Sequence, residues 1–424
     1  MSMYQRDFME GTRGTQAVDW EERIDVKRMR RERKERALER LQETELGAML
    51  LVSDPNIRYV TGLAMTGGSG ADHYTVLTEE GDVIHWDTAD HASNQRFNCP
   101  WLQDIRYACP GLGNVPRASG RDSARDFLKA KMADTVATAL EEYGVDDEVL
   151  GIDVGNAGLV SAFEDRGIEV DTGTVPKVME DARKVKTRDE IECLRQVAAI
   201  CEAGFQRITE TARPGASETD LWGAAAEELW KQGAFVGGGY VTSGPNTWPK
   251  HQANTTDRMI RPGDLVYADF YNIGYLGYRS CYYRTFSMGE PTQAQKDAYE
   301  IARDNLYDVL ERIEPGATTD EICQGFPDME GEHADFYDAD EHWQMTTNHW
   351  GHGLGLQLYE VPLIWRGLSP EHPIEIEEGM TMAVETQEPA ENQGVRVEEM
   401  VVVRENGVEI LSQWPVEEIT RIDY

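Results

Sequence analysis

An internal repeat in the second half of the chain constrains its fold more than any other sequence feature. The segment RPGDLVYAD (261–269) matches EEGMTMAVE (377–385), and in both copies an acid follows the glycine by six residues. Further on, GYRSC (277–281) matches GVRVE (394–398). Each pair of segments is typical of two strands joined in a hairpin. Two repeated hairpins in one chain predict a pseudo-twofold domain.

Helices with matching starts precede the two hairpins. TRDE (187–190) forms a capping box, in which a threonine hydroxyl and a glutamate satisfy free amides of a helix that runs to about residue 210. A turn follows, and then a second helix that begins after Ser217 and ends at Gly233. The segments 292–313 and 314–323 repeat the long helix, the turn and the second helix start. The repeating unit is therefore helix–helix–hairpin, and the domain is α+β.

The repeat places chemically reactive side chains at four related positions. Asp269, Glu385 and Glu398 are acids at or near strand ends, and Cys281 takes the fourth position. Buried carboxylates are costly unless they are paired or bind a metal. His352, in the glycine-flanked run GHGLG, offers an imidazole, and flanking glycines let the backbone approach a ligand closely. We expect these side chains to project toward the shared axis and to hold one or two divalent ions.

The residue types indicate which metals would fit. Carboxylates with one imidazole suit Mn, Fe, Co or Zn, and two carboxylates can bridge a pair of ions. A thiolate at Cys281 would shift the preference toward Zn or Fe(II). A free cysteine is also a common small buried hydrophobic residue. The residues alone leave open whether Cys281 is a metal ligand or fills the core.

The first half of the chain has the alternating pattern of an α/β domain. We expect a loosely ordered arm over 1–24, an α/β domain over 25–175, a connector over 173–187 and a catalytic domain over 183–424. The elements predicted in the α/β domain are strands at 48–54, 75–86 and 148–153 and a helix near 122–143. The basic segment 23–43 fits an amphipathic helix, and we interpret it as a solvated helix face rather than a nucleic-acid contact.

Residues from about 183 to 420 resemble the "pita-bread" family of methionine aminopeptidases, prolidases, Xaa-Pro aminopeptidases and creatinase. The preceding domain resembles the N-terminal domain of the creatinase/prolidase branch. Five blocks in the family's order carry the resemblance: SGPNTWPKH to GDLVYAD (243–269), GYRSCYYRTFSMGE (277–290), GHGLG (351–355), EEGMTMAVE (377–385) and GVRVEEMVVV (394–403). The resemblance implies a pita-bread catalytic domain behind a creatinase-type α/β domain, in a homodimer.

The resemblance also implies a set of metal ligands. The family's peptidases hold two ions with Asp, Asp, His, Glu and Glu, and the matching positions here are Asp269, Cys281, His352, Glu385 and Glu398. Cys281 therefore stands in the place of the second aspartate. The gap from Asp269 to Cys281 is one residue longer than is usual in the peptidases, and its length is closer to the creatinase-like branch and to the branch that cleaves dimethylsulfoniopropionate.

Further positions are implied to act on the substrate. His251 matches the family histidine that contacts substrate and shuttles protons. Tyr359 stands where the peptidases usually place a second active-site histidine. Arg284 and Arg396 lie in matching strand copies and could anchor carboxylates of ligands or substrate, although structural ion pairs would look the same in sequence.

The resemblance implies a metal-dependent hydrolase of a peptide bond, of the Xaa-Pro dipeptidase or aminopeptidase type. Water activated at the metal would attack the carbonyl, Glu385 would relay its proton, and His251 would stabilise the intermediate or protonate the leaving nitrogen. A creatinase-like hydrolase of a small C–N compound, with one metal or none, is the alternative that Cys281 and Tyr359 favour. A lyase for a zwitterion such as dimethylsulfoniopropionate would need additional acids where Tyr271 and Leu358 stand. A non-enzymatic binding role ranks last.

Composition excludes several classes of partner. The formal net charge of −36 repels nucleic acid and anionic membranes, and no run approaches the roughly 20 apolar residues that span a bilayer. We interpret the charge as that of a halophile protein. The six cysteines form no CxxC pair, and no signal peptide is recognisable, which predicts a cytoplasmic protein with reduced thiols. The family resemblance implies a small molecule or dipeptide as the substrate.

Overall fold

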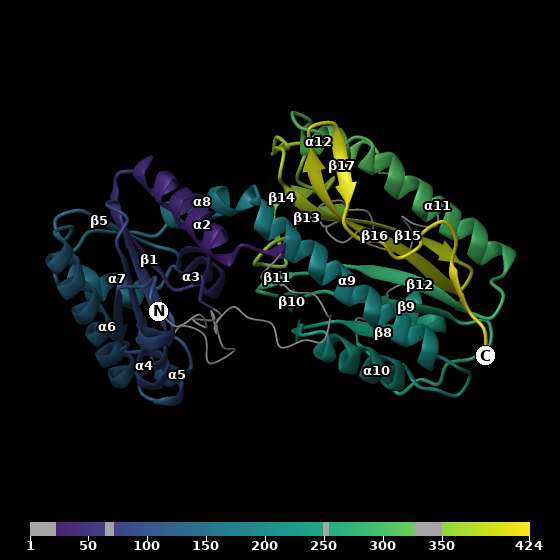
Figure 1. The fold of residues 1–424 in the computed structure, drawn as a ribbon, viewed down its shortest axis with the longest axis horizontal. Coiled ribbons are helices and arrows are strands. Elements are labelled where there is room, and N and C mark those ends of the chain that lie inside the picture. Colours follow the sequence, from purple (N-terminus) through teal and green to yellow (C-terminus); the bar gives the residue numbers. More distant parts are fainter. Residues whose placement is uncertain (1–22, 64–71, 249–253, 327–349) are drawn as a thin grey trace. The chain divides into compact units, whose positions relative to one another are not determined.

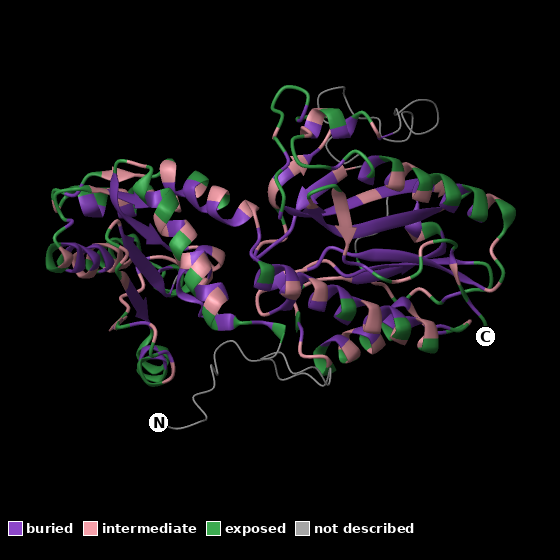
Figure 2. Ribbon diagram, turned by 45° about the horizontal axis from the view of Figure 1, so that its top comes forward, coloured by how far each residue is buried: buried purple, intermediate pink, exposed green. Residues whose placement is uncertain are grey.

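The computed structural model describes residues 23–63, 72–248, 254–326 and 350–424. The chain divides into two compact units, of which Asp25–Arg183 makes up one and Lys184–Tyr424 the other (Figure 1). Most of the arm expected over 1–24 lies outside the described residues. In both units the strands are buried and the outward faces of the helices are exposed (Figure 2).

The N-terminal unit is built on one mixed six-stranded sheet with the order β4-β3-β2-β1-β5-β6. Its strands are β1 (Leu46–Leu51), β2 (Tyr74–Thr78), β3 (Val83–Asp87), β4 (Asp104–Tyr107), β5 (Val149–Ile152) and β6 (Val170–Asp171). Its helices are α2 (Val26–Gln42), α3 (Asp54–Thr61), α4 (Ala89–Asn98), α5 (Asn114–Ala118), α6 (Asp122–Tyr143), α7 (Ala157–Glu164) and α8 (Thr174–Lys184). The predicted strands and the helix at 122–143 are confirmed.

The segment 173–187 is more regular than the connector that the sequence suggested. It contains helix α8, whose buried residues Val175, Val178, Met179 and Ala182 are spaced three and four positions apart. That spacing forms one apolar stripe on a helix. The helix ends at the junction between the two units.

The described part of the C-terminal unit contains three further sheets, of which the smallest has the order β11-β10-β7, together with long helices. Its helices are α9 (Arg188–Thr211), α10 (Glu218–Lys231), the 3-10 turn η1 (Gly244–Thr247), α11 (Gln293–Leu310) and α12 (Thr319–Cys323). Its strands are β7 (Phe235–Val236), β8 (Tyr240–Ser243), β9 (Leu265–Asp269), β10 (Ile273–Tyr275), β11 (Tyr278–Arg279), β12 (Tyr283–Met288), β13 (Trp350–Gly353), β14 (Glu360–Ile364), β15 (Thr381–Ala390), β16 (Gln393–Arg404), β17 (Gly407–Ile410) and β18 (Thr420–Ile422).

The two copies of the repeat form two halves of this unit. The first half has the sheet β18-β12-β9-β8 and the second has β14-β13-β15-β16-β17. Helices α9 and α10 lie on one side of the strands and α11 lies on the other (Figure 1). The halves meet where the hydroxyl of Thr285 in β12 accepts from the Arg396 amide at 2.9 Å and donates to the Arg396 carbonyl at 3.0 Å.

The helix starts confirm the repeat in detail. The first helix of each half begins with a capping box, at Thr187 and at Thr292, and so does the second, at Ser217 and at Thr318. In each box a hydroxyl side chain and a side chain three residues later satisfy amides that have no partner within the helix. The helix–helix–hairpin order predicted for both copies is therefore present.

The two hairpins differ in register. In the second half Glu385 of β15 pairs directly with Glu398 of β16. In the first half Asp269 of β9 pairs with Tyr283 of β12, so Cys281 lies two residues before the paired position and outside the strand. The expectation that all four positions project from paired strands is therefore met by three of them. Cys281 lies instead in the irregular stretch between β11 and β12.

Candidate metal centre

Three of the predicted ligands converge on one point in the C-terminal unit. The side chains of Cys281, His352 and Glu398 are buried, and one ligand atom from each lies within 4.8 Å of the others. His352 is brought there by β13 and Glu398 by β16, which are the two neighbours of β15 in the sheet. A thiol, an imidazole and a carboxylate are the donor types that tetrahedral zinc sites use. We call these three residues the Cys–His–Glu cluster.

The polar atoms of this cluster lack partners from the protein. Within the described residues, His352 Nε2 and both carboxylate oxygens of Glu398 are buried without a hydrogen bond, and so is Oδ1 of Asp269. The other imidazole nitrogen, Nδ1 of His352, lies 3.0 Å from the Gly353 carbonyl, which orients the ring. Buried polar atoms without partners are rare and costly. Their common position fits a bound cation.

Burial and mutual repulsion control the ionisation of the cluster. Burial, followed by the charges of Glu385 and Asp269, raises the pKa of Glu398. Burial, followed by the charge of Glu398, raises the pKa of the Cys281 thiol. Burial lowers the pKa of His352 to about 4, so its imidazole is neutral and can act as a ligand. A divalent ion would favour the ionised forms of the thiol and the carboxylate.

Asp269 and Glu385 flank the cluster and have protein partners of their own. The hydroxyl of Tyr267 donates to Asp269 Oδ2 at 3.1 Å, and the indole N–H of Trp350 donates to Glu385 Oε1. Burial, followed by the charge of Glu385, raises the pKa of Asp269 to about 7. Burial also raises the pKa of Glu385, although the charge of Arg396 and a hydrogen bond from Tyr283 oppose it.

The two arginines suggested as anchors for carboxylates, Arg396 and Arg284, have different surroundings. Arg396 lies two residues from Glu398, with its guanidinium 5.3 Å from the centre of the Tyr267 ring, and its charge lowers the pKa of both Asp269 and Glu385. Arg284 points to the other face. Its Nη2 donates to both carboxylate oxygens of Glu399, at 2.8 and 2.9 Å, and the pair is buried.

The role suggested for Arg284 as a substrate anchor is therefore not supported. Its guanidinium is committed to Glu399 and to the backbone carbonyl of Glu398. Successive residues of a strand point to opposite faces, so neighbouring Glu398 and Glu399 belong to different environments. Arg284 supports the strand that carries Glu398 from behind.

Tyr359 stands at the edge of the site. Its ring centre is 4.4 Å from that of His352 and 5.6 Å from that of Trp350, and 53% of the residue is exposed. Its ring therefore forms an aromatic wall of the site, between His352 and the solvent. His251, the predicted proton shuttle, lies outside the described residues.

The glycines that follow His352 are needed because the chain passes close to other atoms of the protein there. A Cβ at Gly353 would lie 2.4 Å from the Val361 carbonyl oxygen, and one at Gly355 would lie 2.3 Å from a carboxylate oxygen of Glu360. That carboxylate accepts from Lys186 at 2.8 Å, in an ion pair with both side chains buried. The glycines permit the close turn that holds His352 in place.

Several residues of the site were missed by the sequence analysis. Tyr267 stands two positions before Asp269, and Trp350 stands two positions before His352. In a strand, residues two apart share a face. That offset was the available signal, and it would have assigned both aromatic residues to the site.

A buried, uncompensated cluster of metal-ligating side chains in a pseudo-twofold α+β unit defines a metal-dependent hydrolase. Comparison with family models agrees: metallopeptidase family M24 matches residues 192–405, and the Creatinase/Prolidase N-terminal domain matches residues 33–185. The chain belongs to metallopeptidase family M24. The α+β pita-bread fold behind a creatinase-type domain is thereby confirmed.

Relatives with different activities match nearly the whole chain. The uncharacterized peptidase YqhT of Bacillus subtilis (strain 168) is 27% identical over 382 residues, covering 88% of this chain and 95% of that protein. The dimethylsulfoniopropionate lyase DddP of Roseovarius nubinhibens is 25% identical over 407 residues, covering 92% and 87%. The structure of an Xaa-Pro dipeptidase from Bacillus anthracis superposes with a TM-score of 0.71 at 24% identity, covering 92% and 99%.

Among the helices that the structure describes, none has the length and apolar character needed to cross a membrane.

Proposed function

We propose that the protein is a metal-dependent hydrolase that cleaves a peptide bond in a small substrate, with Xaa-Pro dipeptides as the first candidates. The observation that carries this proposal is the Cys–His–Glu cluster, in which one ligand atom from each residue lies within 4.8 Å of the others and the His352 Nε2 and Glu398 oxygens are buried. The family membership and the names of relatives such as the Bacillus anthracis dipeptidase point to the same reaction.

We further propose that one ion occupies the site, with Cys281, His352 and Glu398 as its ligands. Asp269 and Glu385 lie beside these ligands, but Arg396 already supplies positive charge to both acids. A second ion would compete with that guanidinium. The charge of Arg396 is not among the influences on Glu398, where burial and the two neighbouring acids dominate. Cys281 then favours a softer metal such as Zn or Fe(II) over Mn.

The chain's own side chains prepare the reaction. When bound, the metal would polarise a carbonyl and acidify water. The carboxylate of Glu385, held by Trp350, has a raised pKa and so accepts and keeps a proton more readily than a surface glutamate. His352 stays neutral and is held by the Gly353 carbonyl. Tyr359 and Trp350 offer aromatic surfaces against which a compact apolar ring such as that of proline can pack.

A second candidate is hydrolysis or elimination on a small nitrogen or sulfur compound. Two observations favour it: Cys281 and Tyr359 replace residues of the peptidases, and one relative is named as a dimethylsulfoniopropionate lyase. The positions of Tyr271 and Leu358 do not supply the additional acids expected for the lyase, so we rank it below the dipeptidase.

Metal content and substrate screening test the proposal together. Wild-type protein and the variants Cys281→Asp and Cys323→Ser are purified with the same metals, and ions per chain are counted by elemental analysis. Cys323 is another buried free cysteine of this unit, outside the cluster, and serves as the control. Each protein is then assayed with Xaa-Pro dipeptides, creatine and dimethylsulfoniopropionate.

We expect one ion in the wild type and in Cys323→Ser, with dipeptide cleavage. If Cys281→Asp binds two ions, the presence of cysteine instead of aspartate at this position is the reason that the wild type binds only one. No metal in the wild type, or activity on creatine or dimethylsulfoniopropionate alone, would overturn the dipeptidase proposal.

A further inference from the structure

A cavity in the N-terminal unit has the opposite charge to the chain as a whole. It has a volume of about 770 Å³ and lies between α2, the end of α3 and the segments around residues 81–83 and 98–104. Its basic residues are Lys27, Arg30, Arg31 and Lys34, all from α2. We call it the α2 cavity. Two of the chain's ten lysines line this one cavity although the chain carries a net charge of −36.

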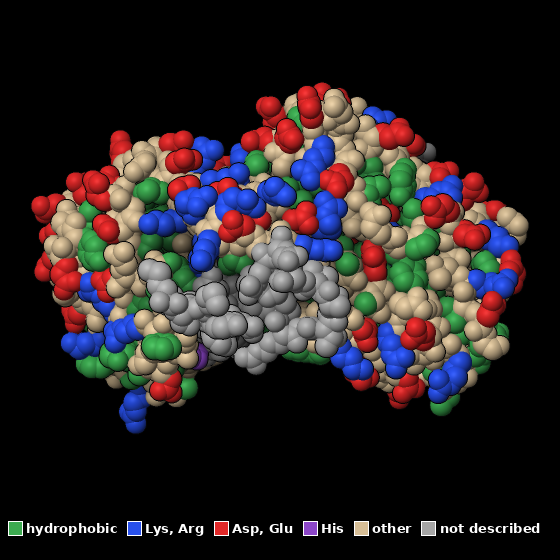
Figure 3. Space-filling view, viewed as in Figure 1, with side chains coloured by type: hydrophobic (Ala, Val, Ile, Leu, Met, Phe, Trp, Pro, Cys, Tyr) green, Lys and Arg blue, Asp and Glu red, His purple; other side chains and the backbone are tan. Residues whose placement is uncertain are grey.

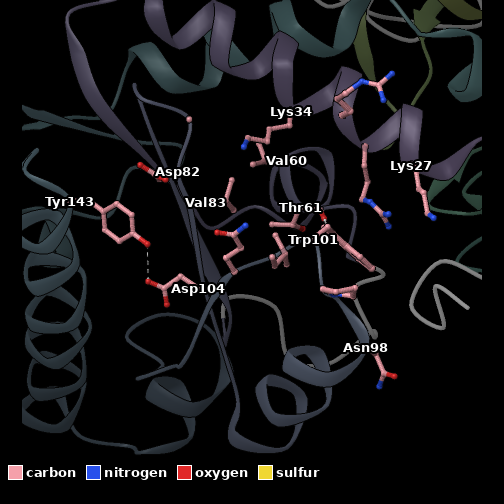
Figure 4. Close-up of a pocket in the computed structure, with 16 residues that line it drawn as sticks. Lys27, Lys34, Val60, Thr61, Asp82, Val83, Asn98, Trp101, Asp104 and Tyr143 are labelled. Carbon is pink, nitrogen blue, oxygen red and sulfur yellow. Dashed lines mark hydrogen bonds between the residues drawn. The ribbon is translucent and has the colours of Figure 1, made fainter. Parts of the chain in front are cut away.

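The spacing of the basic residues explains why they act together. Lys27, Arg31 and Lys34 follow one another at four and three positions, so they form one stripe along α2. Figure 3 shows Lys and Arg side chains gathered over this helix. In Figure 4, Lys27 and Lys34 extend from α2 on one side of the cavity, and Asp82 and Tyr143 lie on the other.

The positive charge of the stripe is poorly neutralised by the protein. Neither Lys27 nor Lys34 forms an ion pair with any residue that the structure describes. Arg31 is 3.8 Å from Glu35 with both side chains more than half exposed, a geometry of little energetic weight. Two acids lie on the far wall: Asp104 is paired with Arg106 at 2.6 Å and accepts from the Tyr143 hydroxyl at 3.2 Å, and Asp82 is a second carboxylate against the four basic side chains of α2.

The floor of the cavity is apolar and aromatic. Trp101 is half-buried, its indole N–H donates to the Thr61 carbonyl at 2.8 Å, and the Arg30 guanidinium lies 3.6 Å from its ring centre. Val83 and Leu102 line the cavity beside it. A concave site of this size with an apolar floor and a few charged groups is typical of small-molecule binding. It is too enclosed for a duplex and too charged for an apolar ligand.

We propose that the α2 cavity binds a small organic phosphate. A phosphate monoester carries between one and two negative charges at neutral pH, which matches a wall that carries several cations better than a single carboxylate does. Lysine acts on phosphate as a point charge and needs no fixed geometry. The organic part of the ligand lies against Trp101 and Leu102. This site is separate from the metal centre and does not rest on the proposed hydrolase activity.

Calorimetric titration of the full chain tests the site. The probes are inorganic phosphate, pyrophosphate, AMP and ADP, with citrate as a polycarboxylate of similar charge. The variant Lys27→Gln/Lys34→Gln removes two charges from the cavity. The control Arg40→Gln/Lys131→Gln removes two charges from exposed positions of the same unit that do not line it. Glu398→Gln reports any phosphate that binds at the metal centre instead.

We expect AMP or ADP to bind more tightly than inorganic phosphate, and the cavity variant to weaken that binding at least about tenfold, or about 1.4 kcal/mol. The control and Glu398→Gln should bind as the wild type does, and dipeptide cleavage should be unchanged in the cavity variant. If only inorganic phosphate or citrate binds, the proposal that the ligand is an organic phosphate is wrong. The proposal is also wrong if no probe binds at millimolar concentration, or if binding is lost in Glu398→Gln but kept in the cavity variant.

Discussion

Glu385 and Glu398 lie directly opposite each other on the paired strands β15 and β16. Like charges in this cross-strand position destabilise a sheet, and burial makes the repulsion stronger. Trp350 and Tyr283 partly stabilise the Glu385 carboxylate, whereas beside the Glu398 carboxylate stands, among the described residues, only the Cys281 thiol, a weak donor, and the charge of Arg284 only partly opposes the effect of burial. The fold therefore carries a local cost that a bound cation would offset.

Replacing Glu398 with glutamine should stabilise the metal-free protein and abolish its stabilisation by metal. Burial raises the pKa of Glu398 above its unfolded value, so the cost of ionising it in the folded state grows as pH rises above about 4.5. The gain in Tm should therefore be larger at pH 9 than at pH 5. Thermal unfolding with a chelator and with added Zn²⁺ measures both effects.

The neighbouring variant Glu399→Gln is the matched control. It weakens the buried pair with Arg284 and should lower Tm with and without metal. A lower Tm for metal-free Glu398→Gln at pH 9 would contradict the predicted repulsion.

Cobalt substitution should report the thiol directly. If Cys281 is a ligand, the Co²⁺-loaded protein should show a thiolate-to-cobalt charge-transfer band in the near ultraviolet, because the ligand is the ionised sulfur. The band should disappear in Cys281→Ser and persist in Cys323→Ser. A wild-type spectrum without the band, in protein shown to contain cobalt, would leave Cys281 as a core-filling residue.

Removing the Arg284 guanidinium should destabilise the C-terminal unit strongly. Arg284→Met leaves Glu399 buried without its cation, a change that typically costs about 3–5 kcal/mol. The double variant Arg284→Met/Glu399→Leu should recover most of this loss, since neither charge remains. Denaturant unfolding measures the free energy of unfolding of the wild type, the single variant and the double variant. If Arg284→Met lies within about 0.5 kcal/mol of the wild type, the predicted role of the buried Arg284–Glu399 pair is wrong.

Glu388 provides a pH-dependent prediction away from the metal centre. Burial raises the pKa of this residue to about 7. Its folded form holds a proton that the unfolded form loses near pH 4.5, so the residue costs stability as pH rises from 4.5 to 7. Glu388→Gln should therefore raise Tm at pH 8 and leave it unchanged at pH 4. An equal effect at both pH values would exclude titration as the cause.

Local sequence signals predicted most of the fold. Capping boxes such as that of Thr187 need only four residues, and the apolar periodicity of a helix such as α6 needs only its own segment. Helix α8 lies in the segment interpreted only as a connector, although its apolar stripe from Val175 to Ala182 is present in the sequence. The internal repeat predicted from the sequence alone which segments of the first half of the C-terminal unit match which segments of the second half.

The candidate site was predictable in residue type but not in arrangement. The repeat and the family resemblance named the five ligand positions, and the structure brings Cys281, His352 and Glu398 together. The register difference between the hairpins could not be read from matching glycines, because it depends on the short β10–β11 hairpin between Asp269 and Cys281. Arg284 and Arg396 lie in matching strand copies but not at matching positions, because GYRSC (277–281) against GVRVE (394–398) pairs Arg396 with Arg279.

The buried pair of Lys186 and Glu360 has a consequence for dissecting the chain. Lys186 precedes the first catalytic-unit helix, yet its amide donates to the Gly379 carbonyl at 2.9 Å and its ammonium is held within the turn that follows His352. A fragment that begins at Arg188, the first residue of α9, would lack both contacts. The turn that follows His352 would then be held less firmly. A fragment meant to contain the whole C-terminal unit should therefore start at or before Lys184, within the segment that the sequence analysis interpreted as a connector.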